Sequence, residues 1–126
     1  MPTRPATVDL GKLGEDLACR ELVRRGYAVL ARRHRTRYGE IDIVARDDDV
    51  IVFVEVKARR TKRYGGAIEA VTRHKQRKVA AMALDYLARV NRLEARCRFD
   101  VVAIDRVGTD RPEIQVIPNA FPAIGS

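Results

Sequence analysis

The two strand-like runs on either side of the aspartates at 47–49 constrain the fold more than any other part of the sequence. Residues 40–46 and 50–58 are rich in isoleucine and valine, and three consecutive aspartates between them are typical of a tight turn. We therefore expect two neighbouring antiparallel strands. Charged residues interrupt the apolar pattern of both runs: Asp42, Glu55 and Lys57.

Burial predicts the register of this hairpin. Side chains alternate between the two faces of a strand, and a one-residue slip exchanges the faces. An odd loop would mix Ile41 with Glu55, whereas an even loop gathers the aliphatic residues of both strands on one core-facing side. In the even register these pairs face each other: Ile41 and Val56, Ile43 and Val54, and Ala45 and Val52. The same register sets Asp42 opposite Glu55 and Glu40 opposite Lys57.

This register brings two carboxylates together, and like charges directly opposite each other destabilise a sheet. A bound divalent cation would remove the repulsion, because hard cations take oxygen ligands from carboxylates and backbone carbonyls. The alternative is a solvated face on which Glu40 and Lys57 form an ordinary surface ion pair. Spacing alone favours this simpler alternative slightly.

The other elements follow from hydrophobic periodicity and capping residues. One α/β domain with a mixed sheet and the order α-β-β-β-α-β-β accounts for the whole chain, residues 1–126, with residues 1–7 loose. Besides the hairpin, the sequence predicts helices at about 8–25 and from the N-cap Thr72 to about Val90, a short helical turn at 67–71, and strands at 27–33, 98–105 and 113–117.

The charge balance points to a polyanionic partner. The formal net charge is +8, and arginine supplies 20 of the 25 basic residues. The arginine guanidinium matches phosphate oxygens well, although a genome that favours arginine codons would give the same composition. Aromatic residues make up 6% and tryptophan is absent, which argues against a base-stacking platform for single strands.

The sequence also indicates the compartment. Cys19 and Cys97 are far apart and have no metal-binding spacing, so we expect free thiols in a reducing cytoplasm. The sequence has no apolar run of the roughly 20 residues that a membrane helix needs, and no secretory signal. We therefore expect no membrane association.

Two further polar residues lie where they could reach the strand pair. Glu15 lies at the edge of the apolar face of the first helix and either points toward the sheet or is an ordinary boundary residue. Gln76 lies in the first turn of the second long helix, where it could reach a site or simply satisfy the helix start.

Basic residues cluster at 32–37, 59–63 and 73–78, on segments that flank the acids. Each cluster alone is most often a solvated surface, but together they favour a phosphate-binding rim around an acidic centre. The residues expected to contact nucleic acid are Arg35, Arg37, Arg59, Arg60, Arg63, Arg73 and Lys75. We interpret His34 and His74 as surface or phosphate-contacting residues rather than metal ligands.

Asp42 followed by twelve residues and then Glu-Val-Lys resembles the signature of the PD-(D/E)xK nuclease superfamily. Four ordered blocks are more specific: GEDLACRELVRRGY, GEIDIVARDDDVIVFVEVKAR, AVTRHKQRK and RFDVVAI. Together they closely resemble the YraN-like family of small bacterial proteins, which are regarded as endonuclease candidates. The resemblance runs from about residue 11 to residue 121. Ile41 stands where the superfamily name has proline, a position that the superfamily varies.

The resemblance implies a restriction-endonuclease-like core and a site for Mg²⁺ or Mn²⁺. Asp42, Glu55 and the Val56 carbonyl would ligate the metal, and Glu15 would help to bind metal or water. Lys57 would orient or deprotonate the attacking water or stabilise the developing charge, and Gln76 matches the polar residue of the second helix.

The sequence therefore leads to two main hypotheses. The first is a metal-dependent nuclease that cleaves phosphodiester bonds, with DNA favoured over RNA and structured or branched DNA suggested only by fold analogy. The second is a non-catalytic nucleic-acid-binding module with a nuclease fold. A purely structural basic protein is a weaker third option. A two-fold homodimer would suit cleavage of two strands.

Overall fold

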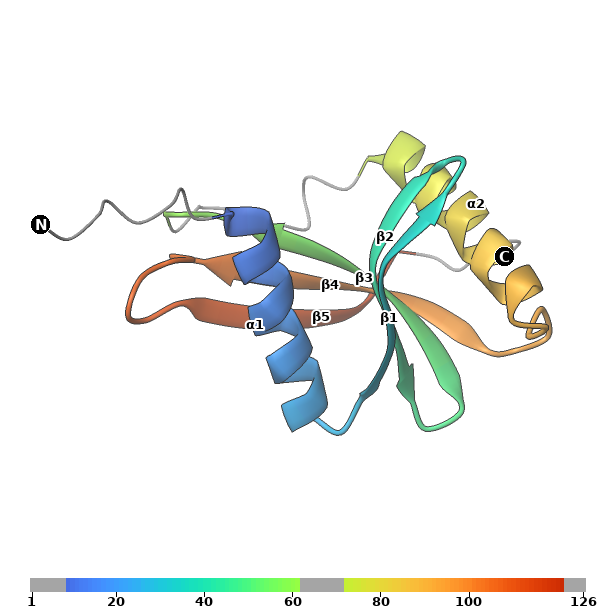
Figure 1. Cartoon of the computed structure of the whole chain (residues 1–126), viewed down its shortest axis with the longest axis horizontal. Coiled ribbons are helices and arrows are strands. Elements are labelled where there is room, and N and C mark those ends of the chain that lie inside the picture. Colours follow the sequence, from blue (N-terminus) through green and yellow to red (C-terminus); the bar gives the residue numbers. More distant parts are fainter. Residues whose placement is uncertain (1–8, 62–71, 122–126) are drawn as a thin grey trace, which may run out of the picture.

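The computed structural model describes residues 9–61 and 72–121, which form a five-stranded sheet between two helices (Figure 1). Helix α1 lies against one face of the sheet and α2 against the other. The expected α/β class, the mixed sheet and the order α-β-β-β-α-β-β are confirmed. The elements are α1 (Leu10–Arg24), β1 (Ala28–Thr36), β2 (Gly39–Asp47), β3 (Val50–Ala58), α2 (Arg73–Arg89), β4 (Cys97–Asp105) and β5 (Glu113–Phe121). The predicted turn at 67–71 and residues 1–7 lie outside the described residues.

The strands lie side by side in chain order, from β1 at one edge to β5 at the other. Neighbouring strands are antiparallel except β3 and β4, which are parallel. Because β4 is parallel to β3, the chain must cross back to the end of the sheet where β3 begins, and α2 is part of this crossover connection. The hairpin of β2 and β3 is therefore in the interior of the sheet.

Side-chain caps begin both helices. The Asp9 carboxylate accepts a hydrogen bond from the Lys12 backbone N–H at 3.1 Å, and Thr72 Oγ1 accepts one from the Lys75 backbone N–H at 3.1 Å. The predicted N-cap at Thr72 is thus confirmed. Gly26, with a φ of 95°, follows the end of α1. Neither described helix is long and apolar enough to cross a membrane.

The predicted even register of the central hairpin is correct over its paired part. Ile43 pairs with Val54, and Ala45 pairs with Val52. The connection is two residues long, with Asp48 in the left-handed region at a φ of 54°. Aspartate tolerates this conformation better than most residues, which explains why an aspartate run can make the turn.

The predicted division into one apolar and one charged face is wrong, because both faces of the hairpin are buried. Ile43, Ala45, Val52 and Val54 pack with α1 residues, whereas Val44, Ile51 and Phe53 pack with α2 residues. An inner strand covered by a helix on each side needs apolar residues on both faces. The alternation of charged and apolar residues holds only toward the end of each strand that carries Asp42 and Glu55.

Ile41 shows where the regular alternation of β2 ends. Ile41 and Ile43 are two residues apart, yet Ile41 packs in the α2 cluster and Ile43 in the α1 cluster. The pairing partners of these residues on β1 are His34 and Arg32. Arg33, between these partners, has a φ of 51°. The side chains that face α1 and those that face α2 therefore exchange their order along the strands at Asp42 on β2 and at Arg33 on β1.

Two strands end three or four residues later than predicted. β1 continues to Thr36 instead of ending at 33, because pairing with β2 continues through a basic segment that lacks a strand pattern. β5 continues to Phe121 instead of ending at 117. Proline is tolerated at the edge of a sheet, so Pro118 does not end β5. A register shift between Phe99, which pairs with Phe121, and Val101, which pairs with Ile117, accommodates the extra length.

Candidate active site

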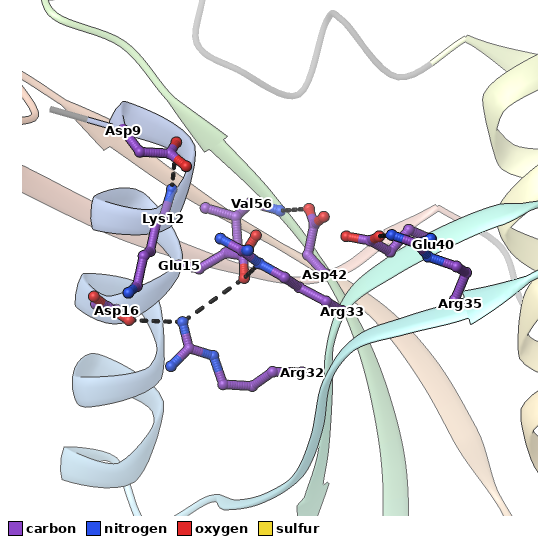
Figure 2. A network of polar contacts seen from close by, with 10 residues as sticks. All are labelled: Asp9, Lys12, Glu15, Asp16, Arg32, Arg33, Arg35, Glu40, Asp42 and Val56. Atoms are coloured by element: carbon purple, nitrogen blue, oxygen red, sulfur yellow. Dashed lines mark hydrogen bonds and ion pairs between the residues drawn. The ribbon is translucent and has the colours of Figure 1, made fainter. Parts of the chain in front are cut away.

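The strands β2 and β3 separate at Asp42. Their backbone pairing runs from Asp47 with Val50 to Ile43 with Val54. At the next position, Oδ2 of Asp42 accepts a hydrogen bond from the Val56 backbone N–H at 2.8 Å. The carboxylate thus replaces a strand-to-strand hydrogen bond at the point where the two strands diverge (Figure 2). This location explains how a half-buried carboxylate interrupts the isoleucine pattern of β2.

The surroundings of Asp42 oppose its ionisation. Burial, the nearby Glu55 carboxylate and, more weakly, Glu15 raise the pKa of Asp42 to about 6. The hydrogen bond from Val56 and the Lys75 ammonium act in the opposite direction but do not cancel the effect. Asp42 and Glu55 are therefore close enough for their carboxylates to repel each other, as the sequence predicted.

Glu55 is held by two lysines. Oε1 of Glu55 lies 3.6 Å from the Lys57 ammonium nitrogen and 3.1 Å from that of Lys75. Lys75 belongs to the first turn of α2, so this ion pair joins that turn to β3. Gln76 follows Lys75 and is half-buried. The expected pairing of Glu40 with Lys57 is not formed: the Glu40 carboxylate lies 3.7 Å from Arg35.

Glu15 points toward the sheet, as one of the two sequence interpretations expected. It is only 8% exposed, and its Oε1 accepts a hydrogen bond from Arg33 Nε at 2.9 Å (Figure 2). The guanidinium of Arg32 lies 3.7 Å from the same oxygen. The preceding residue, Gly14, allows a close approach of α1 to β3, because an added Cβ would lie 2.7 Å from the Ala58 Cβ.

A pocket of about 300 Å³ opens between α1 and the ends of β2 and β3. Its polar lining includes the Glu15 and Asp42 carboxylates, and its remaining walls come from α1 and β3. The lining residues are Leu10, Gly11, Glu15, Asp42, Val56, Lys57 and Ala58. Four of the residues expected from the sequence therefore lie around one pocket, and Glu55 is connected to them through Lys57.

The carboxylate pair is chemically suited to a hard divalent cation. Asp42 and Glu55 offer oxygen ligands, and their mutual repulsion is what a cation would relieve. In the described parts of the chain, no three histidine, cysteine, aspartate or glutamate side chains gather closely enough to hold an ion by themselves. A metal at this site would therefore need backbone oxygen, such as the predicted Val56 carbonyl, or water to complete its ligands. The contact with Arg33 already engages Glu15.

The basic residues expected to contact nucleic acid differ in their surroundings. Arg35, Arg37, Arg60 and Arg73 are exposed. Arg59 is half-buried, and its backbone is tied to the end of β4 through Ile104 and to Val107. Arg63 lies outside the described residues.

Other residues correct or extend the sequence interpretation. His34 is half-buried rather than freely exposed: its ring packs edge-on against Tyr86 at a centroid distance of 5.1 Å, and its Nε2 lies 3.6 Å from Asp85. His74 is exposed. Both cysteines are free and half-buried, and burial raises the pKa of each thiol. The pairing of Arg33 with Glu15 was not expected, although the basic cluster at 32–37 was noted.

The sequence model of one family matches residues 14–104, which is most of the chain. This family is described as "Uncharacterised protein family UPF0102". The chain belongs to the UPF0102 family. This family is the YraN-like group that the sequence blocks resembled. The matched residues include Glu15, Asp42, Glu55, Lys57 and Gln76, so all five candidate catalytic positions lie within the family region.

Relatives of this UPF0102 protein come from several bacteria and match it over nearly their full lengths. A UPF0102 protein of Geobacter sulfurreducens is 50% identical over 112 residues, which cover 89% of this chain and 88% of that relative. A UPF0102 protein of Symbiobacterium thermophilum is 47% identical over 114 residues, covering 90% and 97%. One of Rhodococcus opacus is 46% identical over 112 residues, covering 89% and 95%.

Proposed function

We propose that this UPF0102 protein is a metal-dependent nuclease that hydrolyses phosphodiester bonds in DNA. The observation that carries the proposal is the position of Asp42. It lies where β2 and β3 separate, hydrogen-bonded to Val56, beside the Glu55 carboxylate and on a pocket that Lys57 also lines. This arrangement supports the D…ExK interpretation, because Asp42, Glu55 and Lys57 come from neighbouring strands of the sheet.

Each candidate residue has a separate role in the proposed phosphodiester hydrolysis. Asp42 and Glu55 would hold Mg²⁺ or Mn²⁺, which when bound polarises phosphate and lowers the pKa of water. Lys57, beside Glu55, can donate a hydrogen bond to a phosphate oxygen or to the attacking water, and its positive charge favours the transition state over the ground state. Glu15, fixed by Arg33, can orient water in the pocket.

The proposal requires that metal binding and DNA cleavage depend on the same residues. Lys57→Ala and Asp42→Ala are expected to abolish cleavage of labelled DNA while binding persists. Linear, flapped, branched and single-stranded substrates with Mg²⁺ and with Mn²⁺ would identify the preferred class. Glu40→Ala, which changes a nearby carboxylate paired with Arg35, is the matched control and should cleave normally. Cleavage at the wild-type rate by rigorously purified Asp42→Ala protein would refute the assignment.

A non-catalytic nucleic-acid-binding module is the second candidate, and one observation favours it. Lys57 and Lys75 already balance Glu55, and Arg33 balances Glu15, so these two acids have cationic partners without a metal. A module of this kind would bind DNA through its exposed arginines, and its melting temperature would not respond to Mg²⁺ or Mn²⁺. The nuclease predicts a rise in melting temperature that Asp42→Ala removes.

A further inference from the structure

The hairpin between β1 and β2 carries an exposed tyrosine at its tip. Thr36 pairs with Gly39, and the two residues between them, Arg37 and Tyr38, form the turn. Tyr38 is 38% exposed and is the only aromatic residue among the exposed large apolar side chains of the described part of the chain. Its neighbours Arg35 and Arg37 are exposed, and the Arg35 side chain reaches 86% exposure.

Local contacts hold this tip in one conformation. Thr36 Oγ1 donates to the Gly39 carbonyl at 2.9 Å and accepts from the Tyr38 N–H at 3.0 Å. The Arg37 guanidinium lies 4.9 Å from the centre of the Tyr38 ring and donates to the Tyr38 hydroxyl at 2.7 Å. A tyrosine fixed in this way loses little conformational entropy when it binds a ligand.

Helix α2 braces the base of the same hairpin. Gly39 has a φ of 137°, and a Cβ at this position would lie 3.3 Å from the Met82 sulfur and 3.8 Å from Lys78. On the other strand, His34 packs against Tyr86. The hairpin therefore projects from a packed base beside α2, as Figure 1 shows.

The tip lies on the same strand as the candidate active site. Tyr38 precedes Asp42 by four residues, which corresponds to about 13 Å along a strand. Stacked nucleotides rise about 3.4 Å each, so the tyrosine would meet nucleic acid about four nucleotides from a phosphate held at Asp42. Arg35 and Arg37 supply positive charge there, opposed by the carboxylate of Glu40.

We propose that Tyr38 stacks on an unpaired base, so that the substrate is nucleic acid with unpaired nucleotides within about four positions of the cleaved bond. Every base has an aromatic face that a tyrosine can stack on, whereas a base inside a duplex is already stacked. A single exposed tyrosine accommodates one base, which agrees with a composition too poor in aromatic residues for an extended single-strand platform. The position of the cleaved bond, though not the stacking itself, rests on the proposed nuclease function.

Stacking can be measured without cleavage. The wild-type protein in EDTA is titrated into a duplex carrying 2-aminopurine in a short single-stranded gap, and into the fully paired duplex. We expect quenching of the gapped probe and tighter binding to it. Tyr38→Ala should lose the quenching and weaken binding to the gapped duplex by about 5- to 150-fold, the range typical of one base–aromatic stack. Tyr38→Phe should restore both, because it keeps the ring.

Leu93→Ala provides a matched control, since it removes another exposed apolar side chain, one that is 60% exposed and lies beyond the far end of α2. It should behave like wild type. Equal wild-type affinity for gapped and paired duplexes, or unchanged quenching in Tyr38→Ala, would overturn the proposal. The quenching assay contains no metal and is therefore independent of cleavage. Quenching in EDTA together with no cleavage in Mg²⁺ or Mn²⁺ would support base stacking by Tyr38 and refute the nuclease proposal. Cleavage together with no quenching would support the nuclease and refute base stacking by Tyr38.

Discussion

Replacing Asp42 with asparagine should stabilise the protein at neutral pH and remove a specific pH dependence. Asparagine retains an oxygen that can accept the hydrogen bond from the Val56 N–H, but it carries no charge to oppose Glu55. The pKa of Asp42 is about 6 in the fold against 3.8 for an ordinary aspartate. The folded protein therefore holds this proton up to a higher pH than the unfolded chain does.

The sign and size of the effect follow from this difference. Between about pH 4 and pH 6 the folded state binds more protons, so the free energy of unfolding falls as the pH rises through this window and levels off above it. About two pKa units correspond to about 3 kcal/mol. Wild type and Asp42→Asn should thus be similar in stability near pH 4, and the variant should be more stable by about 3 kcal/mol at pH 8.

Urea denaturation in EDTA at a series of pH values measures the difference directly. Asp16→Asn is the control, because the hydrogen bond from Arg32 lowers the pKa of Asp16. The difference in stability between wild type and Asp16→Asn should therefore change with pH in the opposite direction. Parallel wild-type and Asp42→Asn curves from pH 4 to pH 8 would refute the reasoning, because they would show that the Asp42 carboxylate ionises normally. Adding Mg²⁺ at pH 8 should stabilise the wild type and leave Asp42→Asn unchanged.

Two further substitutions test the packing around the site. Gly14→Ala should lower the free energy of unfolding by about 1–2 kcal/mol, measured by urea denaturation, because its Cβ would overlap that of Ala58 and the overpacking exceeds the gain in helix propensity. Unchanged stability would show that α1 can move away from β3 at little cost. Asp100→Ala should lower the free energy of unfolding by about 1–3 kcal/mol, because it leaves the Asn119 N–H without its acceptor, while the half-buried Arg98 keeps its ion pair with Asp47; unchanged stability in the same assay would contradict that account.

The central hairpin was predictable because its information is local. The even register followed from grouping the aliphatic residues of both strands on one face, and Ile43, Ala45, Val52 and Val54 do share a buried face, so Ile43 could be paired with Val54 before any tertiary contact was known. Which faces are buried was not predictable in the same way. Burial of Phe53 and Val44 depends on α2, whose placement follows from a crossover between distant strands. The assumption of one solvated face suits a two-layer protein, whereas this sheet is covered on both sides.

The site was partly predictable for a related reason. The spacing of Asp42, Glu55 and Lys57 identified residues on neighbouring strands, and hairpin geometry brings such residues together. Long charged side chains choose partners across the fold, and sequence spacing does not encode that choice. Lys75 therefore pairs with Glu55, and Arg33 with Glu15, instead of remaining on a solvated rim.

The fold contains a second buried aspartate, and comparing it with Asp42 shows why Asp42 is the better candidate for chemistry. Asp100 is 0% exposed and accepts hydrogen bonds from Arg98 Nε and from the Asn119 N–H, both at 3.1 Å, so its charge is balanced where the sheet is irregular. Asp42 has one N–H partner and faces another carboxylate at Glu55. Its hydrogen bond alone could be made by asparagine without the repulsion. An aspartate at this position costs stability that the fold does not require, and such local costs are typical of functional sites. A charge requirement, which divalent cation binding would explain, accounts for Asp42 better than a structural link between strands does.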